Sequence, residues 1–218
     1  MEPTRPKRSY TSSRRQQQAA ETRLSILEAA RALFAERGYS STTIEAIAQA
    51  AGVAPETVYA AFGNKVTLLQ RLVETTLVGD EEPIPLAERP FVRAALAETD
   101  QAALVRHFAA DMHAIMTRMS PLFAVLNAAA PADAKIAALR AQVLARRREG
   151  MGIFVERLGQ LGSLRRGAAT ADPVATVWAV SSAEVFHLLT HDLGWSEARY
   201  VEWLSDVLAR ALLPEEVR

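Results

Sequence analysis

The sequence has no cysteine among its 218 residues and no net charge, because 25 basic residues balance 25 acidic ones. Without cysteine, a disulfide-stabilised domain, a cysteine-ligated zinc site and a cysteine nucleophile are all excluded. Aromatic residues are scarce at 6%, but 50% of the chain is hydrophobic, which excludes a highly charged disordered protein. A zero net charge argues against a nucleic-acid partner only if the charge is spread evenly.

The charge is not spread evenly along the chain. Residues 1–71 hold 10 basic and 6 acidic residues, whereas residues 72–218 hold 15 basic and 19 acidic ones. The first third of the chain therefore has a positive excess of the kind that attracts phosphate.

Long hydrophobic runs are also lacking. No segment approaches the roughly 18 continuous apolar residues of a membrane helix. The first 15 residues are basic and polar, and no apolar stretch follows them as it would in a signal peptide. The sequence predicts a cytoplasmic protein with no membrane partner.

Helical periodicity dominates what is present. Ala and Leu are abundant, and apolar residues recur at spacings of three and four, which predicts an all-α protein. In the first helix the expected apolar face includes Leu24, Leu27 and Phe34. Helices are expected over residues 16–37, 42–51, 55–62, 65–78, 91–98, 100–118, 121–130, 133–161, 172–191 and 196–213.

Two of the short helices form a predicted helix-turn-helix, in which Gly52 makes the turn. Thr42 is the expected N-cap of the first, in a capping box with Glu45. Pro55 suits the first turn of the second helix. Its exposed face would fit the major groove of DNA, which is about 12 Å wide.

The stretch from Ile26 to Leu69, ILEAARALFAERGYSSTTIEAIAQAAGVAPETVYAAFGNKVTLL, resembles the TetR-type transcriptional regulators. The resemblance implies a homodimer that binds palindromic double-stranded DNA. It also implies a larger helical domain that binds a small molecule and dimerises through the last two helices. The domains expected are a disordered basic arm (1–15), the helix-turn-helix domain (16–63), a connecting helix and linker (64–90), and a ligand-binding and dimerisation domain (91–218).

The same resemblance implies which residues contact DNA. Thr43, Tyr59 and Lys65 match phosphate-contacting positions, although Tyr59 could instead pack under the helix and Lys65 could be a solvated lysine. The stretch that faces the bases holds Pro55, Glu56, Thr57 and Ala60. Where the family often has a capping serine, this chain has Ala54, so a cap worth about 1 kcal/mol is expected to be missing. The basic arm either tracks DNA or only aids solubility.

A small apolar or amphipathic ligand is expected in the C-terminal domain. Phe108 and Met112 are four residues apart and share a helix face. Asn127 is the one amide in an otherwise apolar stretch, and the alternative for each residue is plain core packing. The expected lining is Phe108, Met112, Met116, Phe123, Asn127, Phe154 and Trp178.

His187 and His191 are spaced four apart next to Asp192, a spacing at which two histidines can share a metal. Histidine also suits the C-terminal end of a helix, where it interacts with the helix dipole. The second interpretation is preferred, so no metal and no other cofactor is expected.

The predicted function is a ligand-responsive transcriptional regulator, and specifically a repressor that a small molecule releases from its operator. The alternatives are an activator, a regulator without an effector, a protein-binding adaptor and an all-helical enzyme. No set of nucleophile, base and orienting group is recognisable, so the chain is not expected to be an enzyme.

Overall fold

The computed structural model describes residues 10–78, 88–167 and 171–215. Residues 1–9 of the predicted arm and residues 79–87 of the predicted linker lie outside them. The described residues form helices, turns and bends with no strand, which confirms the all-α prediction. The chain divides into two compact units between Glu74 and Thr75, within the segment 64–90 predicted to connect the domains.

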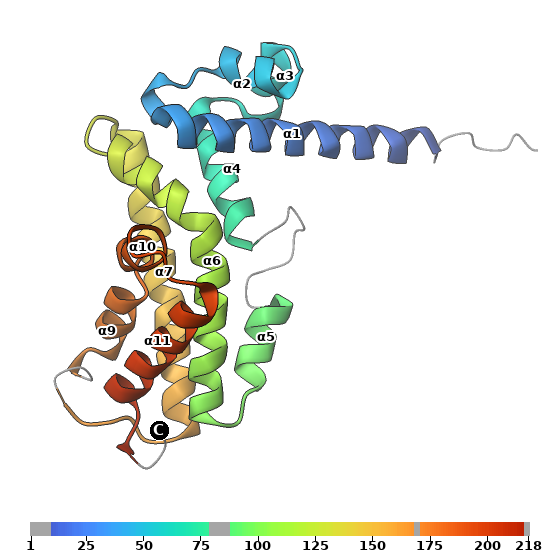
Figure 1. Ribbon diagram of the computed structural model, residues 1–218. Helices are drawn as coiled ribbons and strands as arrows, with labels where there is room; N and C mark the ends of the chain where they lie inside the picture. Colours follow the sequence, from blue (N-terminus) through green and yellow to red (C-terminus); the bar gives the residue numbers. More distant parts are fainter. Residues whose placement is uncertain (1–9, 79–87, 168–170, 216–218) are drawn as a thin grey trace, which may run out of the picture. The chain divides into compact units, whose positions relative to one another are not determined.

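The first unit holds α1 (Tyr10–Ser41), α2 (Ile44–Ala51), α3 (Pro55–Phe62) and most of α4 (Lys65–Val78). Helices α2 and α3 pack together beside α1 (Figure 1). Their core consists of aliphatic side chains around Phe34, with Ile26, Ile47, Val58, Leu68 and Leu72 all inaccessible to solvent.

Helix α1 differs from its prediction at both ends. It begins at Tyr10, six residues before the expected start, so residues 10–15 are helical rather than disordered. At Gly38 the backbone has φ 75° and ψ 169°, and this positive φ breaks the helix directly after residue 37, where the first helix was expected to end. Leu24 was expected on the apolar face but is 45% exposed; Ile26 is buried instead.

The turn into α2 uses a different cap from the one predicted. Thr43 is the N-cap, and its hydroxyl accepts a hydrogen bond from the Ala46 amide at 3.1 Å. Thr42 is buried, and its hydroxyl donates to the carbonyl of Gly38 at 2.8 Å. The predicted capping box is therefore wrong, because the cap lies one residue later and Glu45 is no longer three positions from it.

The second unit is a helical bundle. Helices α6 (Gln101–Ala129) and α7 (Ala134–Leu161) run side by side in opposite directions, and α5 (Pro90–Ala97) lies along α6 (Figure 1). Helix α9 (Pro173–Val180) packs on α7, and α10 (Ala183–His187) packs on α6. A π-helical turn, η2 (Leu188–Asp192), leads towards α11 (Glu197–Leu212), which packs against α6.

Two predictions about these helices are wrong. Segments 100–118 and 121–130 are one helix that contains Pro121, because packing of the flanking turns outweighs the hydrogen bond that proline removes. The segment 172–191 is three pieces rather than one helix, because the chain bends at Ser181 and Ser182 caps a new helix at the Val185 amide.

Within the described residues, no helix is long and apolar enough to span a bilayer.

Candidate nucleic-acid interface

Helix α3 buries one side and exposes the other. Val58 and Phe62 are buried in the first unit, whereas Tyr59 is 47% exposed. The other four predicted DNA-facing residues of α3 share its accessible side: Glu56 and Ala60 are exposed, and Pro55 and Thr57 are half-buried. The exposure of Tyr59 argues against its alternative role as a packing aromatic beneath the helix.

Thr43 lies at the start of α2 with its side chain exposed. Its hydroxyl oxygen accepts from the Ala46 amide and so fixes the first turn of α2. A hydroxyl accepts and donates at once, so the same group can still donate to a phosphate oxygen. The predicted phosphate role of Thr43 is therefore compatible with its role as a cap.

Lys65 is built into the fold of the first unit. Its ammonium donates to the carbonyls of Tyr39 and Thr42, each at 2.8 Å, and lies 4.2 Å from the centroid of the Tyr39 ring. These contacts tie the start of α4 to the turn between α1 and α2. The side chain is half-buried and is not the solvated lysine of the alternative interpretation.

The N-terminus of α3 has the weakness predicted from its sequence. Ala54 is the N-cap residue and supplies no side-chain hydrogen bond. Few side-chain atoms of α3 could contact base edges directly. Ala60 has only a methyl group, and the carboxylate of Glu56 repels the DNA phosphates. On α1, the side chains of Arg14 and Arg15 are exposed.

In the second unit, the aromatic residues predicted to bind ligand include one stacked pair. The rings of Phe108 on α6 and Phe154 on α7 lie 4.0 Å apart between centroids, inclined by 22°. Met112, Met116 and Phe123 are buried on α6, and Trp178 on α9 is half-buried. These side chains belong to the core of the bundle, which both the ligand-binding and the core-packing interpretation allow.

Asn127 is held between two charged residues. Its amide oxygen accepts from Arg140 Nε at 2.6 Å, and its amide nitrogen lies 3.4 Å from a carboxylate oxygen of Glu184. The amide therefore joins α6 to α7 and α10, which gives it a structural role that its sequence neighbourhood did not indicate.

Sequence reasoning missed Arg147, the middle one of three consecutive arginines at positions 146–148. The guanidinium donates to the carbonyls of Trp178 and Ser181 at 3.2 and 2.8 Å. It also lies 4.8 Å from the centroid of the Trp178 ring. Burial lowers the pKa of Arg147, partly offset by the charge of Glu184. Of the three arginines, Arg147 is the one that faces α9. Its neighbouring sequence does not predict this, because the contact depends on where α9 packs.

Tyr200 on α11 is another polar group in this interior. Its side chain is inaccessible to solvent, and its hydroxyl makes no hydrogen bond with the described residues. Burial raises the pKa of Tyr200 to about 12. The ring packs edge-on against Phe186 with centroids 5.1 Å apart.

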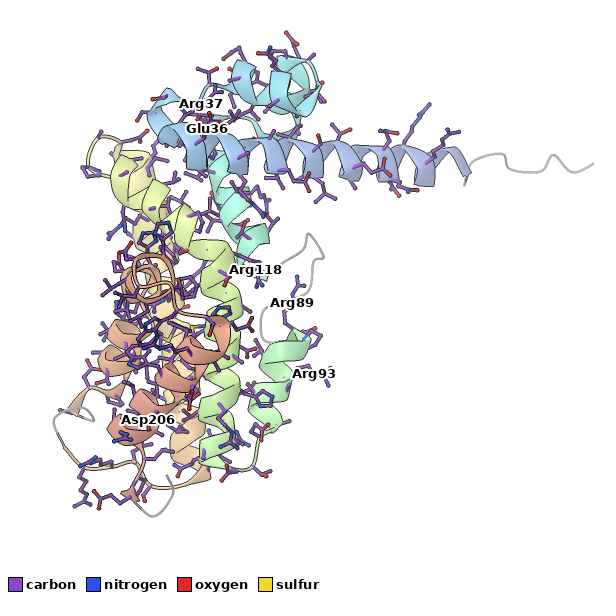
Figure 2. The ribbon with its side chains drawn as sticks, in the orientation of Figure 1. Glu36, Arg37, Arg89, Arg93, Arg118 and Asp206 are labelled. Carbon is purple, nitrogen blue, oxygen red and sulfur yellow. The ribbon has the colours of Figure 1, made fainter. Side chains whose placement is uncertain are left out.

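The last turn of α4, which belongs to the second unit, is fixed by Arg118. This side chain extends from α6 towards the end of α4 (Figure 2). Its Nε donates to the carbonyl of Thr76 at 3.2 Å, at a helix end where carbonyls lack helical partners.

Comparison with known proteins identifies the helix-turn-helix unit. Residues 26–72 match the family described as "Bacterial regulatory proteins, tetR family". The HTH-type transcriptional regulator TtgR of Pseudomonas putida is 42% identical over 62 residues, which cover 28% of this chain and 30% of that regulator. The match thus spans less than a third of the relative's length.

Solved structures extend the likeness of fold to most of the chain. The regulator FadR from Bacillus subtilis, in complex with stearoyl-CoA, has a TM-score of 0.67 at 14% identity, covering 86% of this chain and 98% of its own. SmeT, the repressor of the Stenotrophomonas maltophilia multidrug efflux pump SmeDEF, has a TM-score of 0.60 at 23% identity, covering 91% and 95%.

These comparisons place the molecule in the class of all-helical proteins with an N-terminal helix-turn-helix. Within that class, residues 26–72 carry the helix-turn-helix of the tetR family of bacterial regulatory proteins. The relatives are transcriptional regulators and not enzymes, in agreement with the sequence prediction.

Proposed function

We propose that the chain is a transcriptional regulator that binds double-stranded DNA as a homodimer. Each subunit would place α3 in one major groove of a palindromic operator, with the two helices about 34–36 Å apart. The observation that carries this proposal is the accessible side of α3, where Tyr59 is exposed beside the half-buried Thr57.

In this proposal Tyr59, Thr43 and Lys65 contact phosphates, and Pro55, Glu56, Thr57 and Ala60 face the bases. Because the base-facing side chains are few and short, sequence preference would depend on Thr57 and on DNA shape. Because such a regulator binds chromosomal DNA, the proposed location of the protein is the cytoplasm.

The second part of the proposal is repression relieved by a small apolar or amphipathic ligand in the second unit. The similarity in fold to SmeT, a repressor, and to FadR, solved with stearoyl-CoA, supports it. The stacked Phe108 and Phe154, with Met112, Met116, Phe123, Asn127 and Trp178, are the proposed contacts. A ligand that prefers one spacing of the two α3 helices shifts the dimer away from DNA.

The DNA part is tested by selecting binding sites from random duplexes with the full chain, then titrating the selected site at several salt concentrations. A palindromic site is expected. Tyr59→Phe and Tyr59→Ala are expected to weaken binding to every sequence alike and to leave the salt slope nearly unchanged, because a neutral hydroxyl releases no counterion from the phosphate.

Leu96→Ala is the matched control, since Leu96 is a 37% exposed apolar residue on α5, outside the first unit. Wild-type DNA affinity in both Tyr59 variants would remove the phosphate role of this residue. A folded chain that selects no DNA would overturn the proposal itself.

The ligand part is tested by repeating the titration with stearoyl-CoA and with an amphipathic fluorescent dye. A ligand coupling of about 1–3 kcal/mol would weaken DNA binding by about 5- to 150-fold. A reporter gene downstream of the selected site distinguishes repression from activation. Increased expression on adding the regulator would favour the activator.

A further inference from the structure

Three potential metal ligands meet on one exposed turn of the second unit. His187 Nε2 lies 3.7 Å from Asp192 Oδ1, and His191 Nδ1 lies 3.2 Å from the same oxygen. The imidazole rings of His187 and His191 stack with their centroids 4.4 Å apart. One donor atom from each of the three residues lies within 4.8 Å of the others.

The π-helical turn explains why three residues converge rather than two. In an α-helix only positions three and four apart share a face, so the residue five positions after His187 would point away from it. Here the amide of Leu193 donates to the carbonyl of Leu188, five residues back, at 3.0 Å. The wider turn brings Asp192 beside His187 while His191 stays on the same face.

From the sequence, no metal was expected here, because histidines at the end of a helix can be explained by the helix dipole. The convergence of three potential ligands is not explained in that way. The sequence offered two histidines next to Asp192, and the end of a helix was a sufficient explanation for them. The structure adds a carboxylate oxygen within 4 Å of both rings. π-Turns are rare and occur frequently at functional sites.

The distances suit a small tetrahedral cation. Zn²⁺ bonds imidazole nitrogen and carboxylate oxygen at about 2.0–2.2 Å, which places neighbouring ligand atoms about 3.3 Å apart. The two nitrogen–oxygen distances bracket that value, and the two stacked rings would have to turn for both nitrogens to face one ion. Two imidazoles and a carboxylate are also a ligand set that favours zinc over magnesium or calcium.

We propose that His187, His191 and Asp192 form a Zn²⁺ site with three protein ligands, the fourth position being taken by water. The three side chains are all more than half exposed, so the ion has direct access from solvent. Binding would fix the geometry of η2. None of the three ligands is among the residues proposed to contact DNA, so zinc uptake and DNA affinity are measured separately.

The test is calorimetric titration of Zn²⁺ into the full chain, prepared without a histidine tag and stripped with a chelator. One ion per chain is expected. His191→Ala and Asp192→Asn should each weaken binding at least about tenfold, the lower bound seen even for residues that only support a ligand. Co²⁺ should give the strong visible absorption of a four-coordinate ion, which Asp192→Asn reduces.

The matched control is His107→Ala. His107 is also an exposed histidine beside a carboxylate, with its Nδ1 2.6 Å from Glu98 Oε1, but it lies outside the cluster on α6. Wild-type zinc affinity is expected in this variant. The proposal is overturned if wild-type chain takes up no zinc, or if His191→Ala and Asp192→Asn bind it as tightly as His107→Ala. DNA affinity, measured on the same samples, reports separately on the proposed function.

Discussion

The side chain of Lys65 holds together parts of the first unit, whether or not it also contacts a phosphate. Its ammonium donates to two backbone carbonyls and faces an aromatic ring, all within the first unit. A hydrogen bond from a charged donor contributes about 1.5–3 kcal/mol, less where solvent reaches it. Any contact with phosphate would be additional to this structural role.

Lys65→Met is therefore expected to destabilise the first unit by about 1–2 kcal/mol, because two carbonyls lose a charged donor while the aliphatic stem remains. Urea unfolding measures the change. Lys135→Met, at an exposed lysine in the first turn of α7, is the control and should unfold like the wild type. Equal stability of the two variants would show that the Lys65 contacts contribute nothing.

Tyr200 gives a prediction about pH. Its pKa is raised by burial to about 12, from about 10 in an unfolded chain. The unfolded state therefore loses this proton first, and the free energy of unfolding falls as the pH rises from about 10 to about 12. The contribution is fully present below pH 10.

Tyr200→Phe should remove this alkaline loss, which is about 1–1.5 kcal/mol at pH 11, roughly half of what the two-unit difference in pKa gives above pH 12. Near pH 8 the variant should be at least as stable as the wild type, because the buried hydroxyl has no hydrogen-bond partner among the described residues. Urea unfolding at pH 8 and pH 11 tests both expectations. The wild type, unfolded at the same two pH values, is the reference.

At the scale of elements, local signals predicted some helices to the residue. Pro55 starts α3, and α4 spans the expected residues 65–78, with the Asn64 side chain accepting from the Thr67 amide at 2.9 Å. These boundaries depend on proline, glycine and capping residues that act within a few positions.

Other elements depended on contacts between distant parts of the chain. Nothing local shows that α6 continues through Pro121, because its buried face is defined by α7, α10 and α11. The break after α9 could have been predicted more easily, since Ser182 in the pair Ser181-Ser182 is a suitable N-cap for a new helix. For the candidate site, family resemblance predicted the DNA-facing residues. The contacts of Arg147 with the end of α9 could be found only from the folded structure.

The uncapped start of α3 leads to a prediction for Ala54→Ser. Ala54 has the extended backbone of an N-cap, φ −74° and ψ 148°, so a serine hydroxyl there is well placed to accept from an amide of the first turn. A gain of about 1 kcal/mol is expected, and a thermal melt should show it as an increase of a few degrees. Ala32→Ser, exposed in the middle of α1, should instead be neutral or slightly destabilising.

At the scale of the whole molecule, the zero net charge is the sum of a basic first third and an acidic remainder. The division between the two compact units falls close to this change in charge, after Glu74. An excess of four positive charges in residues 1–71 is modest, so tight binding to DNA would require two subunits acting together.

Dimerisation is predicted through the last helices, where Leu188 is 50% and Leu193 59% exposed. Leu188→Glu should shift a wild-type dimer towards monomer in sedimentation, because a two-fold interface would bring two buried charges together. Ile153→Glu changes a 52% exposed residue of α7 and should leave the dimer intact. A Leu188→Glu dimer as stable as the wild type would place the interface elsewhere.

The π-turn at Leu188–Asp192 also affects how the chain tolerates a change in length. A π-turn contains one residue more than the α-turn it replaces. It can therefore accommodate an inserted residue without displacing the helix before it. Removing Thr190 would return the turn to ordinary helical spacing, and the short connection before Glu197 would take up the difference. The bundle is therefore expected to survive this deletion, and Asp192 would then follow His187 by four positions, on the same face of an ordinary helical turn.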